Sequence, residues 1–137
     1  MIAALVLAAL ALATPVDAAL LAGLPVHKAT LDAHGQVSAC SGPLLSDVAE
    51  KAGLQQGKAL HGSALSNGVV VRASDGYAAL FSLAEIDPGT GNDGAIVATS
   101  CDGRELGDDV GPYHLVVPTD KRPARAVRNV VSIEPAP

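Results

Sequence analysis

The chain has 137 residues, a length that fits one domain, and its formal net charge of −5 argues against nucleic-acid binding by bulk electrostatics. Its aromatic residues are two tyrosines and one phenylalanine, with no tryptophan. These are too few rings for a surface that stacks bases or sugars.

The N-terminal segment is typical of a secretory signal peptide. The run from Ile2 to Ala13 is apolar without interruption but too short to span a bilayer comfortably, and small residues precede a cleavage point after Ala18. We therefore expect a signal peptide over residues 1–18, a mature domain over residues 19–137 and a periplasmic or secreted location. No Lys or Arg precedes the apolar run, so an uncleaved N-terminal anchor stays open. No later segment is long enough to cross a membrane.

Strand patterns and one helix occupy the first half of the mature chain. Residues 28–33 and 37–40 are expected to pair around a turn at His34-Gly35. A helix should follow, with Gly42 as its cap, Pro43 in its first position and Gly53 at its end. Its apolar stripe consists of Leu44, Leu45, Val48, Ala49 and Ala52.

The second half of the chain is mainly β-structure. Residues 69–73 and 78–81 form an expected hairpin around Asp75-Gly76, and Ser82 with Glu85 forms a capping box that begins a short helix or a turn. Three further strands are expected at residues 95–100, 113–117 and 130–133. The order of elements has no βαβ rhythm, so we predict an α+β fold of mostly β mixed sheets with one or two short helices.

The two cysteines, Cys40 and Cys101, are candidates for a disulfide. An even number of cysteines in an exported chain favours a bridge. Two unrelated buried thiols stay open as the alternative, because the sequence does not show whether the two Cβ atoms lie within bonding distance.

A cluster of cations lies between the last two predicted strands. Four of the nine Lys and Arg residues of this acidic chain fall in this one loop, namely Lys121, Arg122, Arg125 and Arg128. Guanidinium groups on a loop between two strands are suited to hold a phosphate or another small anion. The alternative is a solvated loop whose charges keep the protein soluble.

Four stretches of the chain carry a resemblance to a known family. They are CSGPLLSDVAEKAGL (Cys40–Leu54), VVVRASDGYAALFSLAEID (Val69–Asp87), IVATSCDGREL (Ile96–Leu106) and GPYHLVVPTDKRPARAVRNVVSIE (Gly111–Glu134). In order and spacing they resemble the oxidoreductase molybdopterin-binding domain of sulfite oxidase-type enzymes. The resemblance covers nearly all of the mature chain and implies the fold of that domain.

The resemblance also implies a cofactor site in the closing segment. Basic residues of the family's last loop contact the pterin or its phosphate, and Arg125 and Arg128 stand at the matching positions. Lys121 and Arg122 lie in the same loop and could assist them. His114 stands where many members carry an arginine, so we include it as a cofactor-binding candidate, with a hydrogen-bonded strand histidine as the alternative.

One position departs from the family pattern. Asp32 stands where the catalytic members carry the cysteine whose thiolate ligates molybdenum, and neither Cys40 nor Cys101 has the spacing to replace it. A carboxylate is a poor substitute for a soft thiolate. Molybdopterin is thus possible by resemblance, but the sequence nominates no catalytic residue and no metal ligand.

Three functions follow from these observations. The first is an exported, non-catalytic domain that binds a small anionic molecule or an envelope protein. The second is a molybdopterin-dependent oxidoreductase, or one subunit of such an enzyme. The third is a structural or interaction module of the cell envelope.

Overall fold

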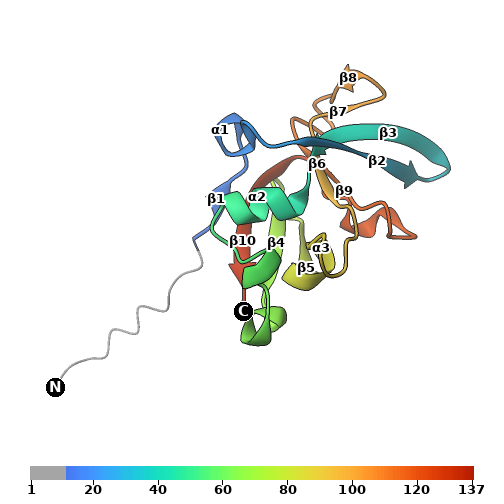
Figure 1. Ribbon diagram of the computed structural model, residues 1–137. Coiled ribbons are helices and arrows are strands. Elements are labelled where there is room, and N and C mark those ends of the chain that lie inside the picture. The colour runs from blue at the N-terminus through green and yellow to red at the C-terminus, as the bar shows by residue number, and fades with distance from the viewer. Residues whose placement is uncertain (1–11) are drawn as a thin grey trace.

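The computed structural model describes residues 12–137 (Figure 1). The apolar run of the predicted signal peptide falls almost entirely on residues 1–11, outside the described residues. Within the described range, ten strands form three sheets and are joined by three short α-helices. The predicted α+β fold with predominant β-structure is confirmed.

The first sheet has four antiparallel strands in the order β1-β10-β4-β5. The strand between β1 and β4 is the last one in the chain, so the two ends of the described chain meet in this sheet. The turn at Asp75-Gly76 joins β4 to β5 as the sequence predicted, with Gly76 at φ 91°. The bounds are Thr14–Pro15 for β1, Val130–Ala136 for β10, Gly68–Ala73 for β4 and Ala78–Ser82 for β5.

The second sheet is built on a long hairpin. Strands β2 (Val26–Ala33) and β3 (Gln36–Pro43) pair along their whole length, around a two-residue turn in which His34 and Gly35 both have positive φ. Two short strands, β7 (Ser100–Cys101) and β8 (Arg104–Glu105), continue the sheet beyond β3.

A two-stranded ladder lies between these sheets. Strands β6 (Ile96–Ala98) and β9 (His114–Val116) are buried on both faces. Val97 and Leu115 point into the main core with the first sheet and the helices, whereas Ile96 and Val116 pack beneath the β2–β3 hairpin. This alternation follows from the two-residue period of a strand and explains why every residue of the ladder except His114 is apolar.

The helices are short and lie against the main core. They are α1 (Ala18–Leu21), α2 (Leu45–Lys51) and α3 (Leu83–Ile86), and 3₁₀ turns occur at Gly57–Ala59, Gly62–Ser66 and Pro123–Arg125. α2 buries Leu45, Val48 and Ala49. It begins later than the sequence predicted.

The start of α2 is shifted because Gly42 and Pro43 belong to the end of β3. A Cβ atom on Gly42 would lie 2.0 Å from the carbonyl oxygen of Val97. Glycine is therefore required here by the close approach of β3 to β6, not by a helix cap. At the other end, Gly53 has φ 97° and the amide of Leu54 donates to the carbonyl of Ala49 at 2.9 Å, so the predicted helix end agrees.

The residues just before α1 are part of the fold. Thr14 and Pro15 pair with Ile133 and Ser132 of β10. Val16 is 6% exposed in the main core, and the Asp17 side chain caps α1. Cleavage after Ala18 would remove all four residues and leave the edge of β10 uncovered.

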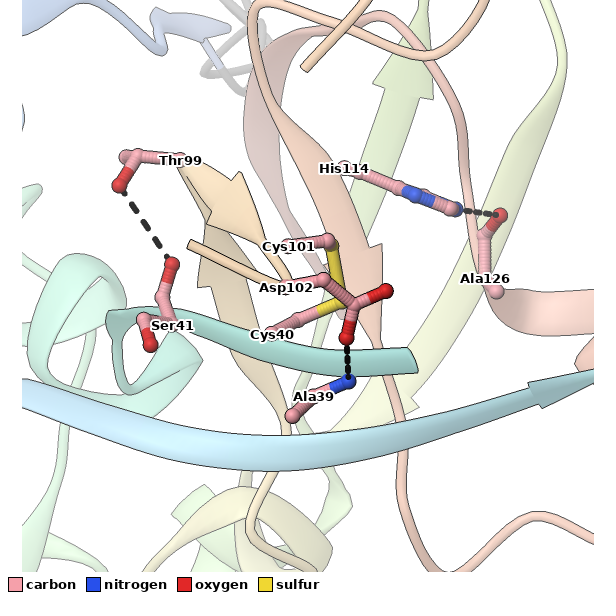
Figure 2. The surroundings of a disulfide bond; sticks show 8 residues. All are labelled: Ala39, Cys40, Ser41, Thr99, Cys101, Asp102, His114 and Ala126. Carbon is pink, nitrogen blue, oxygen red and sulfur yellow. Dashed lines mark hydrogen bonds between the residues drawn. A yellow bond between two sulfur atoms is a disulfide. The ribbon is translucent and has the colours of Figure 1, made fainter. Parts of the chain in front are cut away.

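The disulfide joins Cys40 of β3 to Cys101 of β7, which lie directly opposite each other (Figure 2). Cys40 is fully buried, and the Asp102 carboxylate accepts the amide of Ala39 at 2.9 Å beside the bridge. The short strand β7 is therefore held to β3 by both a covalent and a hydrogen-bonded contact. From Leu12 onward, no helix has the length and apolar character needed to cross a membrane.

Candidate functional site

The four cations of the 121–128 loop do not gather at one point. The loop leaves β9, passes through the 3₁₀ turn Pro123–Arg125 and returns beside β9, where the amide of Leu115 donates to the carbonyl of Val127 at 2.9 Å, before it enters β10. Lys121, Arg122 and Arg128 are exposed, whereas Arg125 turns inward over the edge of β5. The structure therefore separates these cations into distinct environments.

Arg125 is enclosed by carboxylates from two parts of the chain. Its Nε and Nη2 donate to the two oxygens of Asp120 at 2.9 and 2.8 Å, and its Nη1 donates to Glu85 Oε1 at 2.6 Å. The same Nη1 reaches the carbonyl of Leu80 at 3.2 Å, and the guanidinium carbon lies 4.3 Å from the centre of the Phe81 ring.

These contacts give Arg125 a structural role. The hydrogen bonds that Arg125 donates to Asp120 raise its pKa further above an already high value, and the contact with Glu85 acts in the same direction. With its fork taken up by Asp120 and its remaining nitrogen by Glu85, the guanidinium has no bidentate face left for an external phosphate. Arg125 thus ties its loop to β5 and α3, and we assign it to the fold rather than to ligand binding.

Arg128 has the opposite environment. Within residues 12–137 it forms no ion pair, and it lines a cavity of about 360 Å³. Three segments far apart in the chain make this cavity: the β4–β5 turn, the loop before β9 and the connection into β10. The polar residues of the lining are Asp75, Tyr77, Asp109, Arg128 and Asn129, and the apolar ones are Ala73, Pro123, Ala124 and Ala126.

Hydrogen bonds fix the walls of this Arg128 cavity. The Tyr77 hydroxyl donates to the carbonyl of Ala124, joining the β4–β5 turn to the 3₁₀ turn. The Asn129 amide group donates to the carbonyls of Asp108 and Gly111 at 3.0 and 2.6 Å. Because all three segments are connected without a ligand, the cavity is formed in advance of binding.

The remaining cations lie elsewhere. Arg122 borders a smaller hollow of about 120 Å³ between β2 and the loop, together with Asp32 and Asp120. Lys121 borders neither hollow. Asp32, at the position of the family's metal-binding cysteine, therefore borders a different hollow from Arg128, although Pro123 and Ala126 line both hollows.

His114 is a buried strand residue and lines neither hollow. It is 5% exposed, and its Nε2 lies 3.3 Å from the carbonyl oxygen of Ala126 (Figure 2). Burial lowers its pKa below the ordinary value of 6.5, with Arg128 adding to the effect. The ring is therefore neutral near pH 7. Its Nε2–H donates to the carbonyl oxygen of Ala126 and so ties the 121–128 loop to β9.

The residues present do not fit a molybdopterin cofactor. Asp32 offers a carboxylate in place of the thiolate, and Arg125 is already paired. Within residues 12–137, no three side chains among His, Cys, Asp and Glu gather as a metal site.

Comparison with known proteins adds no assignment. Neither a scan against protein-family models nor a search of curated proteins found a match for this chain.

Sequence reasoning identified Arg128 but missed its neighbours. Its cavity is also lined by Asp75, Tyr77, Asp109 and Asn129, and of these the sequence indicated only Asp75, as part of a hairpin turn. The hairpin turn forms as expected, with the amide of Tyr77 donating to Asp75 at 2.9 Å. No sequence signal shows that this turn faces the 123–129 segment.

Proposed function

We propose that this protein is an exported, non-catalytic binding domain that holds a small anionic ligand at Arg128. The observation that carries the proposal is an arginine without an ion pair in the described chain, set in a preformed cavity of about 360 Å³. That volume accommodates a small metabolite.

The carboxylates of the cavity narrow the ligand class. Asp75 uses one oxygen on the Tyr77 amide, and Asp109 makes no hydrogen bond from its side chain within the described residues. Both carboxylates can accept hydrogen bonds from a ligand, but they repel an anion that has no donor. The ligand that suits the whole cavity is therefore a small anion that also carries hydroxyl or ammonium groups.

Two probes separate the contribution of Arg128 to binding from that of the carboxylates Asp75 and Asp109. Inorganic phosphate tests the anion contact alone, and phosphoethanolamine adds an ammonium group that the carboxylates can accept. We expect saturable binding of phosphoethanolamine by calorimetry or by amide chemical shifts, with weaker binding of phosphate. Arg128→Gln should weaken phosphoethanolamine binding by about tenfold or more, the usual loss for a charge-assisted contact.

Lys121→Gln is the matched control, because it removes the same charge from an exposed residue of the same loop that does not line the cavity. It should leave the affinity within about twofold. Equal weakening by both variants would show bulk attraction to the loop and would overturn the proposed site, as would unchanged binding to Arg128→Gln.

Export is supported by the disulfide between Cys40 and Cys101 and by the apolar N-terminal run. Because β1 begins at Thr14 and Val16 is buried, we expect removal of the leader to leave Thr14 in place. Ala11-Leu12-Ala13 supplies small residues at the two positions that a signal peptidase reads. The intact mass of the exported protein should therefore be that of a chain that begins at Thr14. A mass that begins at Ala19, or cytoplasmic retention of the whole chain, would contradict this.

A further inference from the structure

Strand β2 is one outer edge of the second sheet. The backbone N–H and C=O groups of its successive residues point alternately toward β3 and away from the sheet. The carbonyls of Ala39 and Ser41 accept bonds from the β7 side. In an antiparallel sheet the next residues along β3 must therefore bond to β2. Through the register of the hairpin, Ala29 and Leu31 bond to β3, so Val26, Lys28, Thr30 and Asp32 direct their backbone groups outward.

These outward groups have no protein partner in the described chain. No hydrogen bond within residues 12–137 joins the backbone of Val26, Lys28, Thr30 or Asp32 to another segment, and all four residues are exposed. The strand is eight residues long and contains neither proline nor a register shift. In Figure 1 the β2–β3 hairpin extends beyond the rest of the fold. Such an edge is a template for another strand.

The side chains on this edge are complementary to themselves. Lys28 and Asp32 lie two residues on either side of Thr30, on the same exposed face, and neither forms an ion pair in the described structure. If two copies of β2 pair antiparallel about a two-fold axis at Thr30, each Lys28 stands opposite the Asp32 of the other copy.

Other registers lose this match. An axis at Lys28 or at Asp32 places like charges opposite each other, and an axis at Ala29 or Leu31 places each Lys28 opposite an uncharged residue. The outward backbone groups allow all of these axes, because each axis places residues of the 26, 28, 30 and 32 series opposite one another across the edge. The charges of Lys28 and Asp32 therefore select one register among those that the backbone allows.

We propose that β2 is a homodimer interface, in which two copies join their second sheets into one continuous sheet across a two-fold axis at Thr30. Thr30 pairs with itself and Lys28 pairs with Asp32 in both directions, and each pair exchanges two backbone hydrogen bonds. The proposal does not depend on the Arg128 cavity, which lies on other elements.

The loop after β9 borders this edge from Thr30, the residue of the proposed axis, to Asp32. Asp120 and Arg122 lie across the hollow of about 120 Å³ from Thr30 and Asp32. Arg122 is the cation that could compete with Lys28 of the second copy for Asp32. Removing it in Arg122→Gln should therefore leave dimerisation unchanged or strengthen it, and a loss of the dimer in that variant would contradict the proposed pairing.

Sedimentation equilibrium on the mature protein, up to about 1 mM, covers the range expected for a weak edge-to-edge contact. We expect a monomer–dimer equilibrium that Lys28→Asp weakens about tenfold or more, because both charge pairs become repulsive. Asp32→Lys should act in the same way. The combined exchange, Lys28→Asp with Asp32→Lys, should restore the affinity to within about threefold, since the pairs are reversed but remain opposite in sign.

A backbone test separates this interface from a general charge effect. Thr30→Pro removes an outward amide of β2 without breaking a hydrogen bond to β3. The control is Val37→Pro, because Val37 is an exposed residue of β3 whose amide points away from β2. Thr30→Pro should abolish the dimer and Val37→Pro should not. Circular dichroism verifies that each variant is folded.

Amide exchange of the unmodified protein gives an independent readout. Amides of Lys28, Thr30 and Asp32 should exchange at least tenfold more slowly at high than at low protein concentration, whereas those of Ala29 and Leu31 should be protected at both. A monomer at every concentration, or a dimer that the charge exchange fails to restore, would overturn the proposal.

Discussion

Arg125 and Arg128 are three residues apart in one loop, yet they differ in nearly every physical respect. Arg125 is bound to two carboxylates and covers the Phe81 ring, whereas Arg128 is exposed beside a cavity and has no ion pair in the described chain. A guanidinium whose donors are already engaged stabilises the fold, and one whose donors are open can bind a ligand. The position of the neighbouring acids, rather than the positive charge, decides between the two roles.

The largest expected difference is in stability. Arg125→Ala leaves Asp120 and Glu85 without their cation and should lower the free energy of unfolding by about 2 kcal/mol, less than for a fully buried pair because the group is one-third exposed. Arg128→Ala should change it by less than about 0.5 kcal/mol. Urea unfolding of both variants measures this, and equal losses would remove the distinction.

Substitutions of the acidic residues near the two arginines should differ in their effect on stability in the same way. Asp120→Asn breaks the bidentate contact with Arg125 and should cost about 1 kcal/mol, a typical value for one such bond. Asp109→Asn, at the cavity of Arg128, removes the same charge and should leave the unfolding free energy almost unchanged. A larger loss for Asp109→Asn would show that the cavity wall, not the Arg125 contacts, stabilises this region.

Asp93 is a buried carboxyl group whose ionisation is affected by the charges of Arg125, Glu85 and Asp120. Its Oδ1 accepts the amide of Ala95 at 2.9 Å, but its buried Oδ2 has no partner in the described structure. Burial raises its pKa above the ordinary value of 3.8, and Glu85 and Asp120 add to this effect.

A raised pKa means that ionisation of Asp93 disfavours the folded state above pH 3.8. Asp93→Asn should therefore stabilise the protein at pH 7 by about 1 kcal/mol, because it removes the buried negative charge that Glu85 and Asp120 repel. The gain should disappear as the pH falls below 3.8, where both states carry a protonated Asp93. Unfolding curves at pH 7 and pH 3.5 check this, and destabilisation at pH 7 would contradict it.

The smallest effect concerns His114 behind the Arg128 loop. Because burial lowers its pKa, the unfolded chain binds a proton more readily, so the stability of the fold is complete above pH 6.5 and declines as the pH falls below that value. The slope for one proton is at most about 1.4 kcal/mol per pH unit. His114→Gln should flatten the decline between pH 7 and pH 5.5 in thermal unfolding. An unchanged slope would show that other groups cause it.

The fold could be predicted largely from local patterns, and the site could not. Alternation, the Asp75-Gly76 turn and the end of α2 at Gly53 are local signals, and each corresponds to the structure. The start of α2 was wrong because Gly42 is fixed by β6, more than 50 residues away in the chain.

The same dependence on distant parts of the chain explains why the sequence could not distinguish Arg125 from Arg128. Ser82 caps α3 by accepting the amide of Glu85, as the motif predicts, but the carboxylate of Glu85 reaches Arg125 rather than back to the cap. That contact spans 40 residues of sequence. A cluster of cations shows where charge is concentrated along the chain, whereas the pairing of each cation depends on the tertiary fold.

The central claim is that Arg128 meets the ligand while Arg125 holds the loop. A ¹H–¹⁵N spectrum of the guanidinium Nε–H groups, titrated with phosphoethanolamine, observes both residues in one sample. We predict a slowly exchanging Arg125 signal that stays in place and an Arg128 signal that moves and saturates. A saturating shift of Arg125, or the absence of any Arg128 shift, would contradict the account.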